Sequence, residues 1–197
     1  MFYLIIRAII EPFARLFLRI KVTGKENIPQ GGGYIVCPNH ISMADVFALT
    51  VFRCHIRYMG KEELFKVPVL GLLFKALGAF AVQRGKGDMN AIDEACEILQ
   101  KGGVFGIFPE GTRAKDGKPG KAKTGTALIQ IKTKAPILPV SIRYSTGKFK
   151  PFCKTYIHIG KVIDYKEPAE GESLRSELRR ITENLMGEIN TLWEMED

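Results

Sequence analysis

The stretch YIVCPNHISMAD, residues 34–45, decides the fold of this 197-residue chain. Residues 34–37 are a short apolar run typical of a buried strand, and helical signals extend from Ser42 to about residue 52. A strand that leads through a short loop into a helix is the repeating unit of α/β domains. The stretch therefore predicts an α/β fold with polar residues at the carboxyl end of a strand, where such sheets bind ligands.

The same alternation continues along the chain. We expect a single α/β domain over residues 31–197, with a largely parallel mixed sheet flanked by helices. Its predicted strands are residues 55–59, 80–82, 104–108, 137–142 and 155–162, and its predicted helices are residues 88–101, 126–132 and 174–192, with a further apolar segment at 64–77.

The N-terminal segment, residues 1–30, is expected to be a membrane-interface helical segment. Its charges, Arg7, Glu11, Arg15 and Arg19, recur every fourth residue and therefore lie in one narrow sector of a helix. The remaining band of Ile, Leu and Phe suits the surface of a bilayer. The same charges disfavour a secretory signal and a membrane-spanning helix, and Pro12 predicts a break into an amphipathic helical pair. The alternative is a helix packed on the domain's own core.

Charge and cysteine content restrict the partners. The formal net charge is +8, which favours acidic partners such as phosphate groups, anionic bilayers and nucleotide-like cofactors. No nucleic-acid-binding motif is present, so we expect no nucleic acid partner. The four cysteines have no C-x-x-C spacing, which disfavours a zinc site and indicates reduced thiols on the cytosolic side.

Within the first stretch, His40 and Asp45 are candidates for acid–base chemistry. Asp45 can accept the proton of one imidazole nitrogen and leave the other nitrogen free as a base. Residues five apart on a continuous helix would point about 140° apart, so the pairing requires His40 to lie in the loop before the helix. The alternative is that Asp45 only caps backbone amides, because Ser42 and Asp45 have capping-box spacing.

A second polar turn, FPEGTR at residues 108–113, also follows an apolar strand. Its Arg113 can bind a phosphate through two parallel hydrogen bonds, and Gly111 allows a close approach of the backbone. The alternative is a solvated turn without a ligand.

Four blocks in this order resemble the glycerolipid acyltransferase family, closest to bacterial lysophosphatidic acid acyltransferases (1-acyl-sn-glycerol-3-phosphate acyltransferases). They are NHISMAD (39–45), GAFAVQR (78–84), FPEGTR (108–113) and APILPV (135–140). The resemblance implies that His40 is the general base and that Asp45 orients it. It further implies that the acceptor's phosphate and glycerol are bound by Arg84, Glu110, Gly111, Thr112, Arg113 and Lys123, and that Pro136 and Pro139 shape a wall near the acyl chain.

The resemblance implies transfer of a fatty acyl group to the sn-2 hydroxyl of 1-acylglycerol 3-phosphate, giving phosphatidic acid. The donor would be acyl-CoA or acyl-carrier protein, with no metal and no further cofactor. The protein would be peripheral, at the anionic bilayer on the cytoplasmic face of the cell membrane. Gln83 and Met43 depart from the common pattern and leave the exact acceptor open.

Other functions stay open at this stage. The acceptor can be glycerol 3-phosphate or another lyso-phospholipid, and a non-catalytic membrane-surface lipid-binding protein would share the same charge and helix pattern. A second enzymatic hypothesis makes Cys37, three residues before His40, a nucleophile that forms a covalent acyl intermediate.

Overall fold

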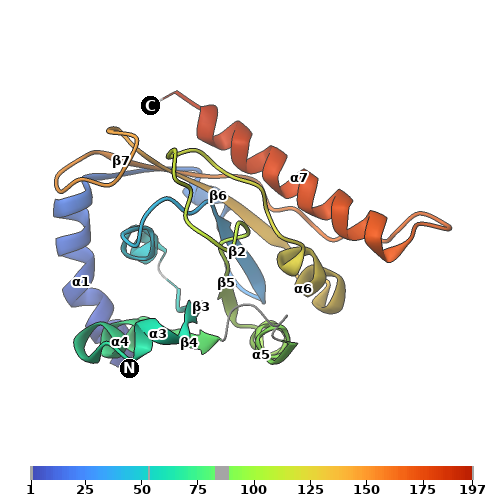
Figure 1. Cartoon of the computed structure of the whole chain (residues 1–197), viewed down its shortest axis with the longest axis horizontal. Coiled ribbons are helices and arrows are strands. Elements are labelled where there is room, and N and C mark those ends of the chain that lie inside the picture. The colour runs from blue at the N-terminus through green and yellow to red at the C-terminus, as the bar shows by residue number, and fades with distance from the viewer. Residues whose placement is uncertain (1, 53, 83–88, 197) are drawn as a thin grey trace.

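The computed structural model describes residues 2–52, 54–82 and 89–196. Within these ranges the strands form one seven-stranded sheet in the order β1-β7-β6-β2-β5-β3-β4. Neighbouring strands are parallel except for the β6–β7 pair, which is antiparallel. The predicted α/β fold with a largely parallel mixed sheet is confirmed (Figure 1). The strands are β1 (Ile20–Thr23), β2 (Tyr34–Pro38), β3 (Ile56–Lys61), β4 (Ala79–Val82), β5 (Val104–Gly106), β6 (Ile137–Tyr144) and β7 (Thr155–Ile159).

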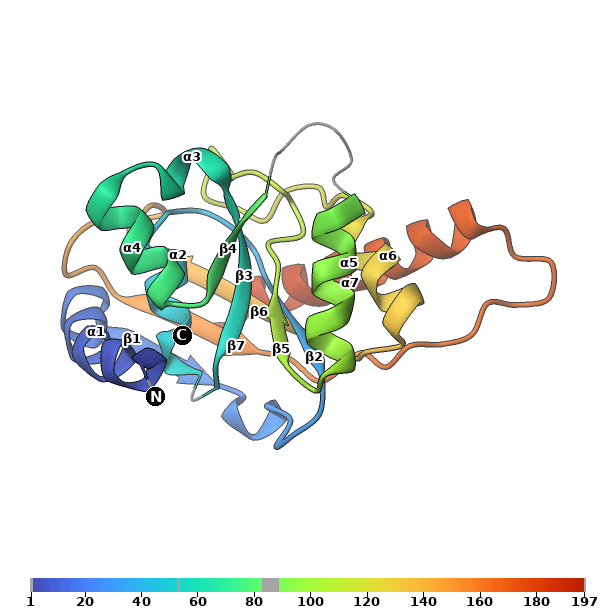
Figure 2. The same ribbon diagram turned by 90° about the horizontal axis from the view of Figure 1, so that it is seen from below.

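Helices cover both faces of the sheet. Helices α5, α6 and α7 lie on one side, and α1 to α4 lie on the other (Figure 2). The helices are α1 (Phe2–Leu18), α2 (Asp45–Ala48), α3 (Glu62–Phe65), α4 (Pro68–Ala76), α5 (Met89–Gln100), α6 (Gly125–Thr133) and α7 (Leu174–Glu194), with short 3-10 turns η1 (Lys25–Asn27) and η2 (Leu49–Val51).

The central strand β2 explains why two cores form. Successive side chains of a strand point to opposite faces, so Tyr34 and Val36 enter the core beneath α1 and α2, whereas Ile35 and Cys37 enter the core beneath α5 to α7. All five residues of β2 are buried, as expected of a strand covered on both faces. Each fully buried aliphatic side chain contributes about 1.5–3 kcal/mol to stability. This burial fixes β2, and with it the start of the His40 loop.

The predicted amphipathic helical pair is wrong, because α1 is a single helix that contains Pro12. Glu11 pairs with Arg7 at 2.6 Å in the turn before the proline and with Arg15 at 2.9 Å across it. Proline removes one helical hydrogen bond, and these pairs one turn apart on either side stabilise the turn that it weakens. The helix ends at Leu18, and the next residues form β1, the edge strand of the sheet, so the segment 1–30 is not helical throughout.

Two further boundaries differ from the sequence prediction. The helix expected from Ser42 begins at Asp45, so residues 39–44 form a longer loop than predicted. The segment 64–77 divides into α3 and α4, with Pro68 in the first turn of α4, where its missing N–H leaves no hydrogen bond unmade.

Candidate active site

The loop after β2 brings His40 and Asp45 together. His40 Nδ1 lies 2.8 Å from Asp45 Oδ2, and Asp45 is completely buried. The carboxylate can only accept, so Nδ1 carries the proton and Nε2 is left as a proton acceptor. His40 lies in the loop ahead of α2, as the pairing requires.

Asp45 also caps the loop, so the two sequence interpretations hold together. Its Oδ2 accepts the backbone N–H groups of Ile41 at 2.7 Å and Ser42 at 2.9 Å. Its Oδ1 accepts the hydroxyl of Tyr144 on β6 at 2.6 Å. Burial and the neighbouring Asp45 raise the pKa of Tyr144, which keeps its hydroxyl protonated as a donor. Four donors therefore hold one carboxylate in position behind the imidazole.

The FPEGTR turn holds the other side of the histidine. The ring of Phe108 stacks on the imidazole with 3.9 Å between ring centroids. The His40 backbone N–H donates to Glu110 Oε1 at 3.0 Å, and the His40 carbonyl accepts from the Ala114 N–H at 2.8 Å. The two loops meet because β2 and β5 are adjacent and parallel, so their carboxyl ends lie at the same edge of the sheet.

Glu110 is one of the residues that the resemblance assigns to the acceptor's phosphate and glycerol. In the structure its side chain is buried, and burial raises its pKa, an effect partly offset by hydrogen bonds from the backbone N–H groups of His40 and Gly120. These two contacts position the loops of the site. The contact of Glu110 with the acceptor stays a prediction.

Asn39 fixes the start of the loop and is a positioning residue that the sequence prediction missed. Its side-chain amide donates to the Ile142 carbonyl at 3.0 Å and its oxygen accepts the Ile142 N–H at 2.7 Å, so it extends the pairing of β2 with β6. Asn39 and Phe108 lie within the recognised blocks, so the sequence could have indicated a role for them at the site. Tyr144 lies outside them, and no sequence signal links it to Asp45.

An apolar cavity of about 140 Å³ lies beside the His40 ring. Its walls come from α2, β3, α3, α4 and β4, and Arg113 lies at its polar side. The lining residues are His40, Met43, Val46, Tyr58, Met59, Gly60, Leu64, Phe74, Ala79, Phe108 and Arg113. Neither Pro136 nor Pro139 is among them. Pro139 lies within β6, paired with Cys37, so the predicted proline wall does not border this cavity.

A second, wider cavity of about 870 Å³ adjoins the first at Arg113; we call it the basic groove. Three cations and no described carboxylate line it. The lining residues are Ile41, Ser42, Thr112, Arg113, Ala114, Lys115, Lys148 and Phe149. Such a groove fits a phosphate group, with the Arg113 guanidinium and the Thr112 hydroxyl as donors.

Of the other predicted phosphate-binding residues, Gly111 precedes Thr112 and lies against Lys123, and neither is among the lining residues of the groove. Gly111 has a φ of 69°, a conformation that favours glycine, and a Cβ there would lie 3.2–3.3 Å from the side chain of Lys123. The backbone N–H of Lys123 donates to the Pro109 carbonyl at 2.8 Å, which joins the segment after the turn to the turn itself. Arg84 lies outside the described residues.

Cys37 does not reach the site. Its side chain is fully buried beneath α6, and burial raises the pKa of the thiol. A thiol without access to substrate and held in its neutral form is no nucleophile, which excludes the covalent Cys37 mechanism.

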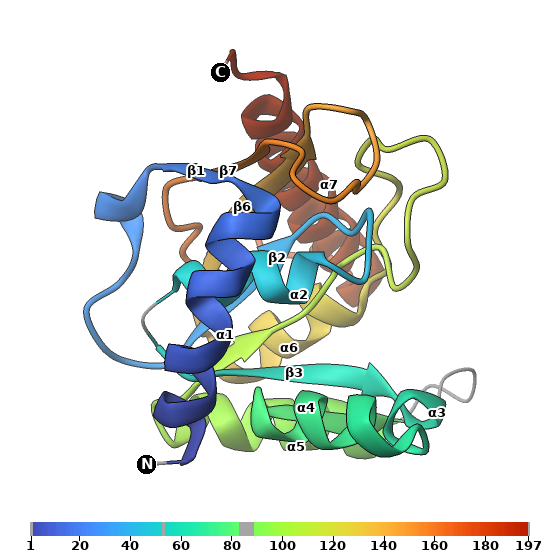
Figure 3. The same cartoon turned by 90° about the vertical axis from the view of Figure 1, so that its left-hand side faces the viewer.

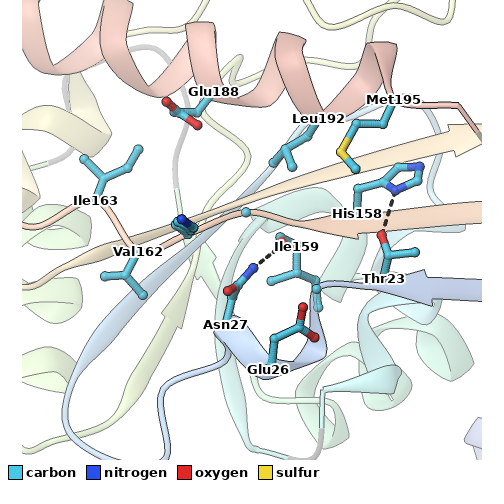
Figure 4. Close-up of a pocket in the computed structure, with 13 residues that line it drawn as sticks. Thr23, Glu26, Asn27, His158, Ile159, Val162, Ile163, Glu188, Leu192 and Met195 are labelled. Carbon is cyan, nitrogen blue, oxygen red and sulfur yellow. Dashed lines mark hydrogen bonds between the residues drawn. The ribbon is translucent and has the colours of Figure 1, made fainter.

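A further cavity lies at the opposite end of the sheet, where β1 and β7 end beneath the last turns of α7 (Figure 4). Its volume is about 480 Å³, and its walls include Glu26, Lys161 and Glu188. His158 lies there with Nδ1 2.8 Å from the Thr23 hydroxyl. None of the predicted site residues lines this cavity.

The dyad, the apolar cavity and the basic groove agree with comparisons to known proteins. The model of the Acyltransferase family matches residues 19–143, a range that includes both loops of the site. The chain belongs to the Acyltransferase family. Arg84 and the other block residues thus fall within the matched part of an acyltransferase sequence.

Individual acyltransferases show the same relationship. The chain is 33% identical over 168 residues to a 1-acyl-sn-glycerol-3-phosphate acyltransferase from Borreliella burgdorferi, covering 79% of this chain and 66% of that protein. It is 35% identical over 132 residues to a protein of the same name from Bacillus subtilis, covering 66% and 65%. The chain therefore spans about two thirds of the length of these relatives.

A solved structure confirms the fold of this acyltransferase family member. The crystal structure of a 1-acyl-sn-glycerophosphate acyltransferase from Thermotoga maritima matches with a TM-score of 0.73 and 31% identity. The match covers 97% of this chain and 81% of that chain.

Proposed function

We propose that this protein transfers a fatty acyl group from an acyl thioester to the free sn-2 hydroxyl of 1-acylglycerol 3-phosphate, which gives phosphatidic acid. One observation carries the proposal: the 2.8 Å bond between His40 and Asp45 leaves Nε2 as a base beside an apolar cavity, next to a groove with three cations. The names of the relatives from Borreliella burgdorferi and Bacillus subtilis support this acceptor.

The proposed chemistry is direct transfer. His40 Nε2 takes the proton of the acceptor hydroxyl while that oxygen attacks the thioester carbonyl carbon. The carbon–sulfur bond then breaks, and the thiolate leaves as a thiol with the proton from His40. General base catalysis of this kind contributes about 10²–10⁴-fold to the rate. Asp45 holds the ring and stabilises the imidazolium that forms.

The two cavities divide the substrates by polarity. The acyl chain of the donor fits the apolar cavity beside His40, and the phosphate of the acceptor fits the basic groove. Arg113 lines both cavities and can hold the phosphate while the hydroxyl reaches His40. The donor's pantetheine-bearing carrier, coenzyme A or acyl-carrier protein, is acidic and suits the +8 net charge.

The surface around α1 supports attachment to a bilayer. Arg7 and Glu11 of α1 are largely covered and Arg15 is exposed, whereas several large apolar side chains of the same helix face outward, unlike those of an ordinary surface helix. Helix α4 lies on the same side of the sheet as α1 (Figure 3). Its side chains Val69 and Leu72 are exposed. Among residues 7–18 of α1, whose side chains are described, the large exposed apolar residues are Ile9, Phe13, Leu16 and Phe17.

Helix α1 therefore combines both alternatives considered from the sequence: Ala14 and Leu18 pack on the core, and the opposite face suits a bilayer interface. None of the helices in the described ranges is both long enough and apolar enough to cross a membrane. From the exposed apolar face of α1 we infer that the protein is peripheral, and we propose that it lies on the cytoplasmic side of the membrane.

A thiol-release assay tests the proposal. Wild-type protein, His40→Ala and the control His158→Gln are incubated with acyl-CoA or acyl-carrier-protein donors, and with lysophosphatidic acid, glycerol 3-phosphate or lysophosphatidylcholine as acceptors. We expect the fastest release with lysophosphatidic acid, a loss of about 10²–10⁴-fold in His40→Ala, and wild-type turnover in His158→Gln. Full activity in His40→Ala contradicts the mechanism. No transfer by the wild-type protein to any acceptor indicates a non-catalytic lipid-binding protein.

A further inference from the structure

The basic groove continues into a third cavity along α1, which we call the α1 groove. Its volume is about 260 Å³, and every side chain that lines it is apolar. The lining residues are Ile10, Phe13, Ala14, Phe17 and Leu18 of α1, Ala44 and Phe47 at α2, and Phe149 from the β6–β7 connection. Because one wall includes Ala44, this groove lies one residue from the Asp45 of the dyad.

Phe149 is common to both cavities. It lines the basic groove together with Arg113 and Lys148, and it lines the α1 groove together with Phe13 and Phe17. Its ring meets the Tyr144 ring edge-on, with 5.9 Å between centroids, and Tyr144 in turn donates to Asp45. A ligand that is anionic at one end and apolar at the other can thus occupy both cavities by crossing a single ring.

The α1 groove also borders the surface proposed to face the bilayer. Phe13 and Phe17 line it and are at the same time exposed on the outer face of α1. A lipid whose chain lies between these two side chains keeps apolar contact while its head group moves toward the protein. The cavity beside His40 is distinct from the α1 groove, since its walls come from β3 and α4 and the described lining residues of the two cavities do not overlap.

We propose that the α1 groove binds the acyl chain that the lysophospholipid acceptor already carries, while its phosphate occupies the basic groove; this inference rests on the proposed function. The acceptor joins a phosphate monoester and a fatty chain through one glycerol, which matches the order basic groove, Phe149, α1 groove. The donor chain then has the cavity beside His40 to itself. The two cavities are lined by different residues around α2, Met43 and Val46 for one and Ala44 and Phe47 for the other, so the two chains do not compete for one cavity.

A matched pair of variants tests the proposal by kinetics. Phe13→Ala removes a side chain that lines the α1 groove, and Leu16→Ala removes one of similar exposure on the same helix that does not line it. The measured quantity is the ratio of KM for long-chain lysophosphatidic acid to KM for a short-chain analogue, in nonionic detergent micelles. We expect Phe13→Ala to raise this ratio about tenfold, from loss of one aromatic contact with the long chain. Leu16→Ala is expected to change both KM values in the same proportion.

The outcomes separate the two occupants that the groove can have. If Phe13→Ala and Leu16→Ala raise both KM values equally, the α1 groove contacts only the micelle or bilayer, and the inference is overturned. Neither result for the two variants affects the proposed activity, because the wild-type protein still transfers an acyl group to lysophosphatidic acid. Failure of the wild-type protein to transfer to any acceptor would instead overturn the proposed function.

Crosslinking gives a readout without turnover. The probe is lysophosphatidic acid with a diazirine at the end of its acyl chain, added to His40→Ala protein in micelles, irradiated and mapped by peptide mass spectrometry. We expect labels on peptides that contain residues 10–18 or 44–49, removed by excess unlabelled lysophosphatidic acid but not by lysophosphatidylcholine, which lacks a phosphate monoester. Labels on the β3 and α4 peptides would place the acceptor chain beside His40 and overturn the inference.

Discussion

The two ends of the sheet each hold a buried histidine beside a cavity, and only one of them is suited to catalysis. His40 is 7% exposed and pairs with the carboxylate of Asp45, whereas His158 is 3% exposed and pairs with the hydroxyl of Thr23. The cavity near His158 has about 480 Å³, more than the 140 Å³ of the apolar cavity beside His40 and less than the 870 Å³ of the basic groove. Neither burial, nor a hydrogen bond, nor cavity size therefore identifies the active site.

The difference lies in the chemistry of the neighbours. A carboxylate fixes the imidazole tautomer and stabilises its protonated form, and a hydroxyl cannot supply the compensating charge. The groove next to His40 has three cations, whereas Glu26 and Glu188 face the other cavity, with Lys161 as a cation. An anionic phosphate is thus attracted to one end of the sheet and repelled by the carboxylates at the other.

Replacing the partner of each histidine should give the largest contrast. An amide at position 45 has one acceptor oxygen and no charge, so it cannot accept at both the Oδ2 and Oδ1 positions and cannot stabilise the imidazolium. We therefore expect Asp45→Asn to lower kcat by about 10²–10⁴-fold. Thr23→Val removes the hydroxyl beside His158 and should reduce stability by about 1 kcal/mol while kcat stays at the wild-type level.

The measurements are steady-state kinetics and the free energy of unfolding for both variants. Loss of turnover in Thr23→Val, with the fold intact, would show that the two ends of the sheet act together. Wild-type kcat in Asp45→Asn would remove the reason for assigning different roles to the two histidines.

Removing one cation at each end should give the next largest difference. Arg113→Ala deletes the guanidinium at the junction of the two site cavities, and we expect KM for lysophosphatidic acid to rise about 10- to 100-fold. Lys161→Ala removes a cation from the other cavity and should leave that KM unchanged. The control Arg113→Lys keeps the charge, and its KM for lysophosphatidic acid should lie between those of Lys161→Ala and Arg113→Ala. Equal KM values for Arg113→Ala and wild type would contradict the phosphate assignment.

Tyr144→Phe tests whether turnover depends on the hydrogen bond that holds the Asp45 carboxylate in position. The substitution removes a 2.6 Å hydrogen bond and leaves Oδ1 of a buried carboxylate without this donor. We expect a loss of about 1–3 kcal/mol in the free energy of unfolding. We also expect a decrease of kcat by less than about tenfold, with KM for the acceptor unchanged. A rise in KM with normal kcat would show that Tyr144 acts on substrate binding through Phe149 instead.

The smallest expected effect is the contribution of Glu110 to the pH dependence of the free energy of unfolding. Its pKa is raised from an ordinary value of 4.5, so its protonated form is favoured in the folded state. The stability that this form contributes is complete below pH 4.5 and is lost as the pH rises through the raised pKa. Glu110→Gln stays uncharged, so its free energy of unfolding should improve relative to wild type as the pH rises toward neutrality. Urea denaturation at several pH values measures this difference; a difference independent of pH contradicts it.

The sequence predicted the fold class and the two loops of the site. Strand and helix patterns are local, so the boundaries of most elements were predicted to within a few residues. The stretch that forms β2 and its loop indicated both the α/β fold and the candidate His40. The prediction failed where long-range contacts decide. Pro12 was expected to break the first helix, but the Arg7–Glu11–Arg15 ion pairs span it. Residues 20–23 were not recognised as a strand, because their pairing partner, β7, lies over 130 residues away.

Within the site, residue types were predictable and their tasks were not. His40, Asp45 and Arg113 carried their chemistry in recognisable blocks. Glu110 was predicted to bind the acceptor's glycerol phosphate, and the sequence did not show that it also accepts the His40 N–H from a buried position, a contact made only when β2 and β5 lie side by side. Tyr144 gave no signal, since it reaches Asp45 across 99 residues of chain.

The sequence alone determined which acids, bases and cations this protein has and that they follow strands of a parallel sheet, because periodicity and turn chemistry act over a few neighbouring residues. Only the tertiary structure decided which histidine has a carboxylate behind it, which cavities border its ring, and how Phe149 joins a basic groove to an apolar one. Those features arise from packing between segments far apart in the chain, and local sequence patterns do not predict such contacts.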